Sequence, residues 1–175
     1  MSNRKLKSIE MGRVSAEEYK NLPDSGIVVV LDNIRSAHNV GSAFRSSDCF
    51  KVDKVWLCGI CAQPPAPEIH KSALGAEFSV DWEYNQDTME VVNRLKSEGY
   101  TIVSVEQTTE SVKLDRFTKE PGKKYALIFG NEVEGVQQSV VNASDFSLEI
   151  PQFGTKHSLN VSVSIGIVLW AVHNN

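Results

Sequence analysis

Residues 27–45 read IVVVLDNIRSAHNVGSAFR, and this stretch holds the strand and the start of the following helix that decide the fold. Its first residues, Ile27 to Leu31, are apolar and mostly β-branched, as in a strand covered on both faces. A polar turn follows, and then an amphipathic stretch from Asn39 to Phe50 that favours a helix. Together they form one βα unit, which is typical of a sheet with parallel strands.

The same alternation continues toward the C-terminus. Short apolar runs bounded by turn residues predict further strands at Lys54–Cys58, Phe78–Trp82, Thr101–Val105, Tyr125–Phe129 and Phe146–Ile150. The clearest helix between them is Asp87–Ser97, where Asp87 can cap the first turn and Gly99 ends the last. The pattern predicts an α/β fold with a mostly parallel sheet flanked by helices.

The segment Leu159–Val172 is ambiguous, because its alternation of apolar and small residues also suits a half-buried strand. As a helix, it would place Ser158, Ser162 and Gly166 in a stripe of small residues that lets another helix approach closely. A length of about 15 residues without a turn signal favours the helix.

The N-terminal residues carry a basic cluster, made of Arg4, Lys5, Lys7 and Arg13. Two readings stay open, a mobile arm that touches nucleic-acid phosphates and a solubilising tail. Behind the cluster, residues 15–18 have the form of a capping box and predict a short helix that stops by Pro23. We therefore divide the chain into an arm with a short helix, residues 1–24, and one domain, residues 25–175.

The composition suits one compact domain, since 41% of the 175 residues are hydrophobic. No apolar run approaches the roughly 20 residues that span a bilayer, and the basic N-terminus has no apolar segment behind it, so we expect a cytoplasmic protein without a membrane partner. A net charge of −4 argues against nucleic-acid binding by bulk electrostatics and confines any such contact to a local face.

Cysteine and histidine give no metal pattern. Cys58 and Cys61 form a Cys-x-x-Cys pair, but no further Cys or His stands at ligand spacing, so we expect two reduced thiols at a strand end. Cys49 is the third cysteine, and His38, His70 and His157 are read as polar loop residues. We expect no bound metal.

Three segments combine side chains that packing alone would not select, namely Asn33–Arg45, Phe129–Gly135 and Ile150–Ser162. Each lies directly after a predicted strand. Because ligands of open α/β sheets bind at the carboxyl ends of the strands, we expect the three segments to converge on one site.

The three segments resemble the SpoU/TrmH family of SPOUT methyltransferases, whose motifs are N-x-x-x-x-x-N-x-G-x-x-x-R, G-N-E-x-x-G and I-P-x-x-G-x-x-x-S-L-N-V-S. All three occur here in order, and the resemblance covers roughly residues 25 to 173. It implies transfer of a methyl group from S-adenosylmethionine to a ribose 2′-hydroxyl of tRNA or rRNA, with S-adenosylhomocysteine as product. It also implies a homodimer and a deep trefoil knot near the C-terminus.

The family motifs assign roles to individual residues. Those implied in catalysis are Arg45, Asn39, Ser158, Asn160 and Glu132. Those implied in binding the methyl donor are Gly130, Asn131, Glu132, Gly135, Ile150, Pro151, Gly154, Ser158, Leu159 and Asn160. Asn39 and Arg45, with the four basic residues of the N-terminus, are the candidates for contact with RNA.

The chemistry favours one role for Arg45. Methylation needs the 2′-hydroxyl aligned with the methyl group and must stabilise charge as the hydroxyl proton leaves. A guanidinium has a pKa above about 12, so Arg45 suits a phosphate clamp and charge stabiliser better than a base. Structural readings remain for the others: Asn39 as cap of a helix beginning at Val40, Ser158 as cap of the last helix, and Glu132 as an anchor for its loop.

Two other functions compete with methyl transfer. One is a catalytically inactive SPOUT-like module that binds RNA or serves assembly, against which the intact motif residues argue. The other is an unrelated α/β nucleotide-binding enzyme, which the absence of a GxGxxG or P-loop pattern after the first strand disfavours.

Overall fold

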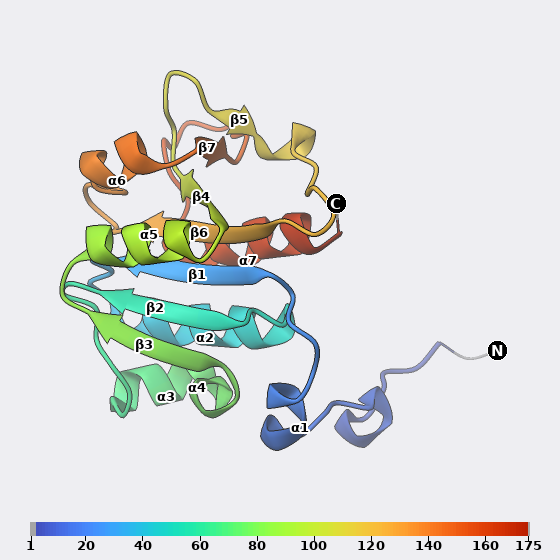
Figure 1. Cartoon of the computed structure of the whole chain (residues 1–175). Coiled ribbons are helices and arrows are strands. Elements are labelled where there is room, and N and C mark those ends of the chain that lie inside the picture. The colour runs from blue at the N-terminus through green and yellow to red at the C-terminus, as the bar shows by residue number, and fades with distance from the viewer. Residues whose placement is uncertain (1–2, 175) are drawn as a thin grey trace.

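The computed structural model describes residues 3–174, and in that part of the chain one sheet of parallel strands forms the centre of the molecule (Figure 1). Its strands are β1 Ile27–Asp32, β2 Lys54–Cys58, β3 Asp81–Asn85, β4 Tyr100–Val105, β5 Val112–Lys113, β6 Lys124–Gly130 and β7 Phe146–Glu149. They stand in the order β3-β2-β1-β6-β4-β7-β5. The predicted α/β class with a parallel sheet is confirmed.

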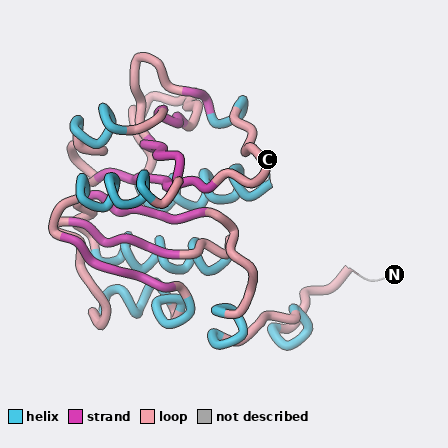
Figure 2. Tube along the Cα trace, viewed as in Figure 1, coloured by secondary structure: helices cyan, strands magenta, loops and turns pink. Residues whose placement is uncertain are grey.

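Helices cover both faces of this sheet (Figures 1 and 2). They are α1 Ala16–Lys20, α2 Ala37–Cys49, α3 Pro67–Ala73, α4 Ala76–Ser79, α5 Thr88–Ser97, α6 Gln138–Ala143 and α7 Val161–Asn174. Helices α5 and α6 lie on one face, while α2, α3 and α7 lie on the other. The predicted helices at α2 and α5 are confirmed, and Asp87 caps α5 by accepting from the Met89 N–H at 2.8 Å.

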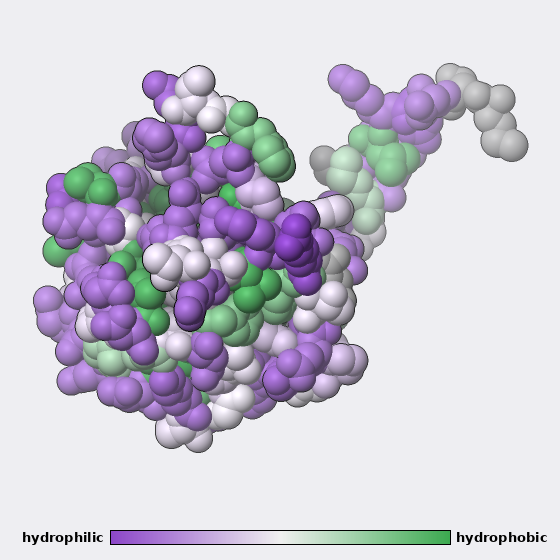
Figure 3. Space-filling view, turned by 90° about the horizontal axis from the view of Figure 1, so that it is seen from above, coloured by the Kyte–Doolittle hydropathy of each residue, from purple (hydrophilic) through white to green (hydrophobic). Residues whose placement is uncertain are grey.

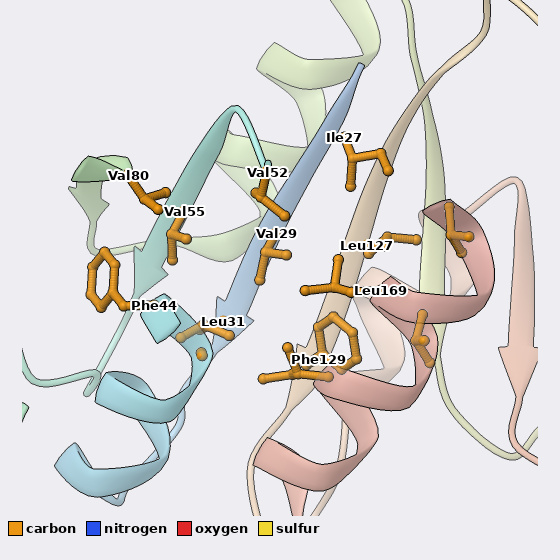
Figure 4. Close-up of a cluster of buried hydrophobic side chains, with 14 of the residues drawn as sticks. Ile27, Val29, Leu31, Phe44, Val52, Val55, Val80, Leu127, Phe129 and Leu169 are labelled. Carbon is orange, nitrogen blue, oxygen red and sulfur yellow. The ribbon is translucent and has the colours of Figure 1, made fainter. Parts of the chain in front are cut away.

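The packing of strand β1 explains why its first five residues, Ile27–Leu31, are all apolar. Ile27, Val29 and Leu31 point into the core under α2 and α7, as Figure 4 shows. Val28 and Val30 point to the opposite side and pack with residues of α5 and α6. Both faces of the strand are therefore buried, as the sequence predicts.

The strand predicted at Phe78–Trp82 is wrong in its first half. Phe78 lies in the one-turn helix α4, and β3 begins only at Asp81. Gly75 adopts a left-handed conformation with φ 96°, which starts the turn, and Phe78 and Val80 donate backbone hydrogen bonds to Gly75 and Ala76. The aromatic and β-branched residues that suggested a strand thus end a helix.

The C-terminal segment is helical from Val161, as its length predicts. Gly166 faces α2 of the same chain, since a Cβ atom on it would lie 3.9 Å from the Ser46 hydroxyl oxygen. The helix next to α7 at this glycine is therefore an intramolecular neighbour. Ser158 precedes α7 and does not cap it, because the side-chain oxygen of Asn160 accepts from the Ser162 N–H at 2.9 Å.

At the N-terminus the predicted capping box is present. The Ser15 hydroxyl accepts from the Glu18 N–H at 3.2 Å, and the Glu18 carboxylate accepts from the Ser15 N–H at 2.7 Å. Tyr19 docks α1 on the body, since its hydroxyl donates toward the carbonyl of Val52 at 3.2 Å. The division at residues 24 and 25 and the trefoil knot stay predictions.

The residues before α1 stand away from the body of the molecule (Figures 1 and 3). Hydrophobic side chains lie among hydrophilic ones on this arm, and Leu6, Ile9 and Met11 are exposed there. Arg4 is not free, because its guanidinium makes a bidentate ion pair with Glu10 at 2.6 and 3.0 Å. Of the predicted basic cluster, Lys5, Lys7 and Arg13 have exposed side chains.

Candidate functional site

The three polar segments meet at the carboxyl edge of the sheet. The first follows β1, the second follows β6 and the third follows β7, and β1 is paired directly with β6. A cavity of about 550 Å³ opens at the ends of β4, β6 and β7, which is a size typical of sites for small molecules and cofactors. Its lining residues are Val105, Glu106, Gln107, Phe129–Gly135, Leu148–Ile150, Gln152, His157–Val161 and Ser164.

Glu132 connects the second segment to the first. Its carboxylate accepts hydrogen bonds from the Asn39 side-chain amide at 2.7 Å and from the backbone N–H groups of Arg35 and Ser36 at 3.1 and 3.3 Å. Partial burial acts to raise the pKa of Glu132, but these hydrogen bonds outweigh it and hold that pKa below its usual range. An ionised carboxylate therefore anchors the loop that leads into α2.

Asn39 extends this connection to the third segment. Its side-chain oxygen accepts from the Asn160 amide at 3.4 Å, and the Asn160 oxygen in turn accepts from the Ser162 hydroxyl at 2.6 Å. Asn39 is not the cap of a helix beginning at Val40, since α2 begins earlier and Ser36 caps it through the Asn39 N–H. Glu132, Asn39 and Asn160 thus form a hydrogen-bonded chain across all three segments.

Two glycines shape the loop after β6. A Cβ atom on Gly130 would lie 1.9 Å from the Gly135 carbonyl carbon, so no other residue fits there without displacing backbone. Gly135 has φ 70° and closes the loop by exchanging backbone hydrogen bonds with Asn131. The Asn131 side chain accepts from the N–H groups of Val133 and Glu134, which fixes the loop from inside.

Glu106 and Gln107, which follow β4, form a wall of the cavity that sequence reasoning missed. Glu106 accepts from the Val136 N–H at 3.1 Å, and the Gln107 amide donates to the His157 carbonyl at 2.6 Å. Both are ordinary polar residues after a strand. The one sequence signal for Glu106 and Gln107 is their position directly after a predicted strand. That this strand, β4, pairs with β6 cannot be inferred from the local sequence pattern.

Most residues expected to bind the cofactor line the cavity, but Pro151 and Gly154 do not. The segment that contains them is partly or fully exposed, and Gln152 is the residue of this turn that reaches the cavity. Ser158, Leu159 and Asn160 line the opposite side, next to the start of α7.

Arg45 lies apart from this hydrogen-bonded chain. It is exposed on α2 and makes no hydrogen bond or ion pair with any residue between positions 3 and 174. It does not line the cavity. The structure therefore brings Asn39, Glu132 and Asn160 together and leaves the Arg45 guanidinium available to a ligand.

The Cys-x-x-Cys pair belongs to the core. Cys58 and Cys61 are buried, and burial raises the pKa of their thiols to about 12 and about 11. The described residues include no group of three or more His, Cys, Asp or Glu side chains placed to hold a metal ion. Within the same residues, no helix is long and apolar enough to span a membrane.

Comparison with known proteins gives a family match over most of the chain. Residues 26–170 match the model of the SpoU rRNA Methylase family. A tRNA (guanosine(18)-2′-O)-methyltransferase from Borreliella burgdorferi is 26% identical over 157 residues, covering 89% of this chain and 70% of that protein. A 23S rRNA (guanosine-2′-O-)-methyltransferase from Nitrosomonas europaea is 31% identical, covering 86% of this chain but only 57% of its own length.

Solved structures share the fold. The TrmH/SpoU tRNA modifying enzyme of A. aeolicus superposes with a TM-score of 0.79 at 25% identity, covering 91% of this chain and 81% of that one. An AdoMet-bound rRNA methyltransferase from Sinorhizobium meliloti superposes with a TM-score of 0.78 at 22% identity, covering 87% and 58%. The Sinorhizobium meliloti enzyme is therefore considerably longer than the chain described here.

Proposed function

This chain belongs to the SpoU rRNA methylase family, and from that premise we propose that it transfers a methyl group from S-adenosylmethionine to a ribose 2′-hydroxyl of a tRNA or an rRNA. The observation that carries the proposal is the convergence of the three family motifs around one cavity, joined by the chain Glu132, Asn39 and Asn160. The relatives' names refer to guanosines of both RNA classes, so the RNA class stays open.

The cavity fits the methyl donor in size and in wall chemistry. Its volume of about 550 Å³ suits a nucleoside with an amino-acid tail. The polar groups of Gln107, Asn131 and Ser158 line the same space. When bound there, S-adenosylmethionine supplies an electrophilic methyl group on a positively charged sulfur.

Arg45 is the residue we assign to the RNA side of the reaction. Its free guanidinium can hold a phosphate through two parallel N–H bonds and so fix the adjacent ribose. Because it stays protonated, it would stabilise negative charge on the 2′-oxygen while the new O–CH3 bond forms, the S–CH3 bond of the donor breaks with its electron pair left on sulfur, and the hydroxyl proton passes to water. Asn39 lies in the first turn of the same helix, six residues before Arg45.

The hydrogen-bonded chain has a positioning role in this proposal. The Glu132 carboxylate accepts from the Asn39 amide, which leaves the Asn39 oxygen to accept from Asn160. Each amide therefore has a set orientation, and the loop before α2 is held at a fixed place relative to the cavity wall. Ser158, exposed at the cavity, completes the set of polar groups for the RNA or the donor.

A homodimer is the proposed assembly, and α7 offers the surface for it. Val163, Ile167 and Trp170 lie at helical spacing on the face that the rest of the chain leaves exposed, and Trp170 is 61% exposed. The other face of α7 is buried against the core. Cytoplasmic location stays a prediction, consistent with an RNA substrate.

Methyl transfer can be tested with labelled S-adenosylmethionine and undermodified cellular tRNA and rRNA. We expect incorporation by the unaltered chain and a loss of about a hundredfold or more in Arg45→Ala, because one essential charge-stabilising donor is removed. Arg116→Ala is the matched control, since Arg116 is also exposed without a partner in the described part of the chain. Donor affinity, measured by calorimetry, should be unchanged in both variants.

Two results would contradict the proposal. Tight donor binding with no transfer to any cellular RNA would indicate an inactive RNA-binding module. Full activity in Arg45→Ala would place the catalytic charge elsewhere. Mapping the methylated ribose in the labelled RNA identifies the target in the same experiment.

A further inference from the structure

Phe153 is an aromatic side chain that the fold does not use. It is 96% exposed, the most exposed of the large hydrophobic residues in the described part of the chain. It lies in the segment between β7 and α7, which contains turns but no helix or strand. Since it covers no other side chain, packing gives no reason for an aromatic residue at this position.

The position of Phe153 relative to the cavity is defined by its neighbours. Gln152, directly before it, lines the cavity, and His157 lines it again at the end of the same turn. The Gln107 amide donates to the His157 carbonyl at 2.6 Å, which fixes that end of the turn to the loop after β4. Phe153 therefore borders the cavity on a turn that is anchored at its far end.

The space around Phe153 is open enough for a large planar partner. A Cβ atom on the next residue, Gly154, would meet no heavy atom within 4 Å. Pro151 stiffens the exit from β7, because its ring restricts the backbone before the turn. An aromatic ring held this way can offer a face to a ligand without rearrangement of the core.

The charge of the turn suits a nucleic acid. Residues 152–158 read QFGTKHS, with Lys156 and His157 but no carboxylate, in a chain whose net charge is −4. Lys156 is exposed and makes no ion pair with any residue that the structure describes. An aromatic side chain and a free ammonium group in one exposed segment are the combination that binds an unpaired base together with its phosphate.

We propose that Phe153 stacks on an unpaired base next to the nucleotide that is methylated, while Lys156 contacts a phosphate of the same strand. This inference rests on the proposed function and adds a substrate class to it: an RNA whose target lies in a single-stranded loop or bulge. A base within a continuous duplex has no free face for the ring.

The test measures equilibrium binding of stem-loops from tRNA and rRNA, so it depends neither on prior methyl transfer nor on mapping of the target. Base stacking on an aromatic side chain is worth about 1–3 kcal/mol, so Phe153→Ala should weaken RNA binding by roughly five- to 150-fold. Phe153→Tyr keeps the ring and should restore most of the affinity. Phe78→Ala removes another exposed phenylalanine, on α4, and should bind RNA as the unaltered chain does.

An RNA with one abasic nucleotide locates the partner base. Removing the stacked base should weaken binding to the unaltered chain by the same factor as Phe153→Ala. Phe153→Ala tested with the abasic RNA should then show no greater loss of RNA affinity than either change alone, because both changes remove the same contact. S-adenosylmethionine affinity should be equal in all variants.

Three outcomes would overturn the stacking proposal. In the first, Phe153→Ala binds RNA as tightly as the unaltered chain does. In the second, the loss of RNA affinity in Phe153→Ala adds to the loss caused by an abasic nucleotide at every position tested. In the third, Phe153→Ala sediments as a smaller species than the unaltered chain. The last result would mean that a second copy covers Phe153. Because these readouts report binding, they are separate from the labelled-methyl assay, whose failure alone would reject the proposed enzymatic function.

Discussion

At the scale of single residues, environment decides what a side chain can do, and spacing alone does not reveal it. The Cys-x-x-Cys pair illustrates this, since such spacing occurs in redox and metal sites. Here Cys61 accepts from the Ile34 N–H at 3.2 Å and donates to the Leu31 carbonyl at 3.3 Å, and its neighbour Cys58 is fully buried. Both thiols are parts of the core.

The reactivity of the thiols follows from this burial. A thiol reagent at pH 8 should modify only Cys49, which is exposed, because burial raises the pKa of Cys58 and Cys61 to about 12 and about 11 and excludes the reagent. In urea all three should react. Cys49→Ser is the control, and in its folded state no thiol should react rapidly with the reagent. Rapid reaction of a second thiol in the native chain would contradict the burial of Cys58 and Cys61.

Asp32 shows what could not be predicted at this scale. It is fully buried at the end of β1, and its carboxylate accepts from Thr88 at 2.7 Å and from the Gln137 side chain and N–H at 2.6 and 2.9 Å. These groups lie at the starts of α5 and α6. No pattern in the sequence links the three positions, so an acidic residue after an apolar run could only be read as part of a turn.

At the scale of elements, local signals predicted helix ends well where a side chain caps the helix. Ser15 and Asp87 cap α1 and α5 as expected. The start of α2 was misplaced because its polar loop contains several residues able to cap, and tertiary contacts to Glu132 select Ser36 among them. Helix α4 was missed for a related reason, as one turn after a left-handed glycine has no periodicity to detect.

Glu132 should stabilise the start of α2 in a pH-dependent way. We expect Glu132→Gln to lower the free energy of unfolding by about 1 kcal/mol at pH 7, a modest value because the carboxylate is partly exposed. The folded-state pKa of Glu132 lies below 4.5, the ordinary value for a glutamate, so this contribution is fully present above that value and is lost as the pH falls through the lowered pKa.

Urea unfolding across pH provides the measurement. The difference between Glu132→Gln and the unaltered chain should be constant from neutral pH to about pH 5.5 and should shrink on further acidification. Glu110→Gln serves as the control, since Glu110 is exposed and has no partner in the described residues. A difference that grows toward acidic pH would show that Glu132 is not held ionised by these hydrogen bonds.

At the scale of the whole molecule, the sequence predicted the class of fold and the convergence of the three motifs, because each motif follows a strand of a parallel sheet. It did not predict the order of the strands. The cavity wall at Glu106 and Gln107 depends on that order, since β4 stands between β6 and β7. Non-local pairing, rather than any local preference, places these residues at the site.

Assembly is the remaining property at this scale. The unaltered chain should sediment as a dimer at micromolar concentration, and Trp170→Asp should sediment as a monomer, because it places a charge on the exposed apolar face of α7. Leu74→Asp alters another exposed hydrophobic residue, between α3 and α4, and should leave the dimer intact. A monomeric unaltered chain, or a dimeric Trp170→Asp, would reject this interface.

The place of β6 between β1 and β4 also governs how the chain reaches its native state. Ile27 pairs with Tyr125, so the central joint of the sheet closes only after most of the chain has been synthesised. Until then β1 and β4 each present an unpaired, apolar edge, and closing so long a loop carries an entropy cost before any pairing compensates it. Such topology makes folding slow and leaves partly folded chains prone to aggregation, so production of this protein should depend on temperature and on chaperone capacity.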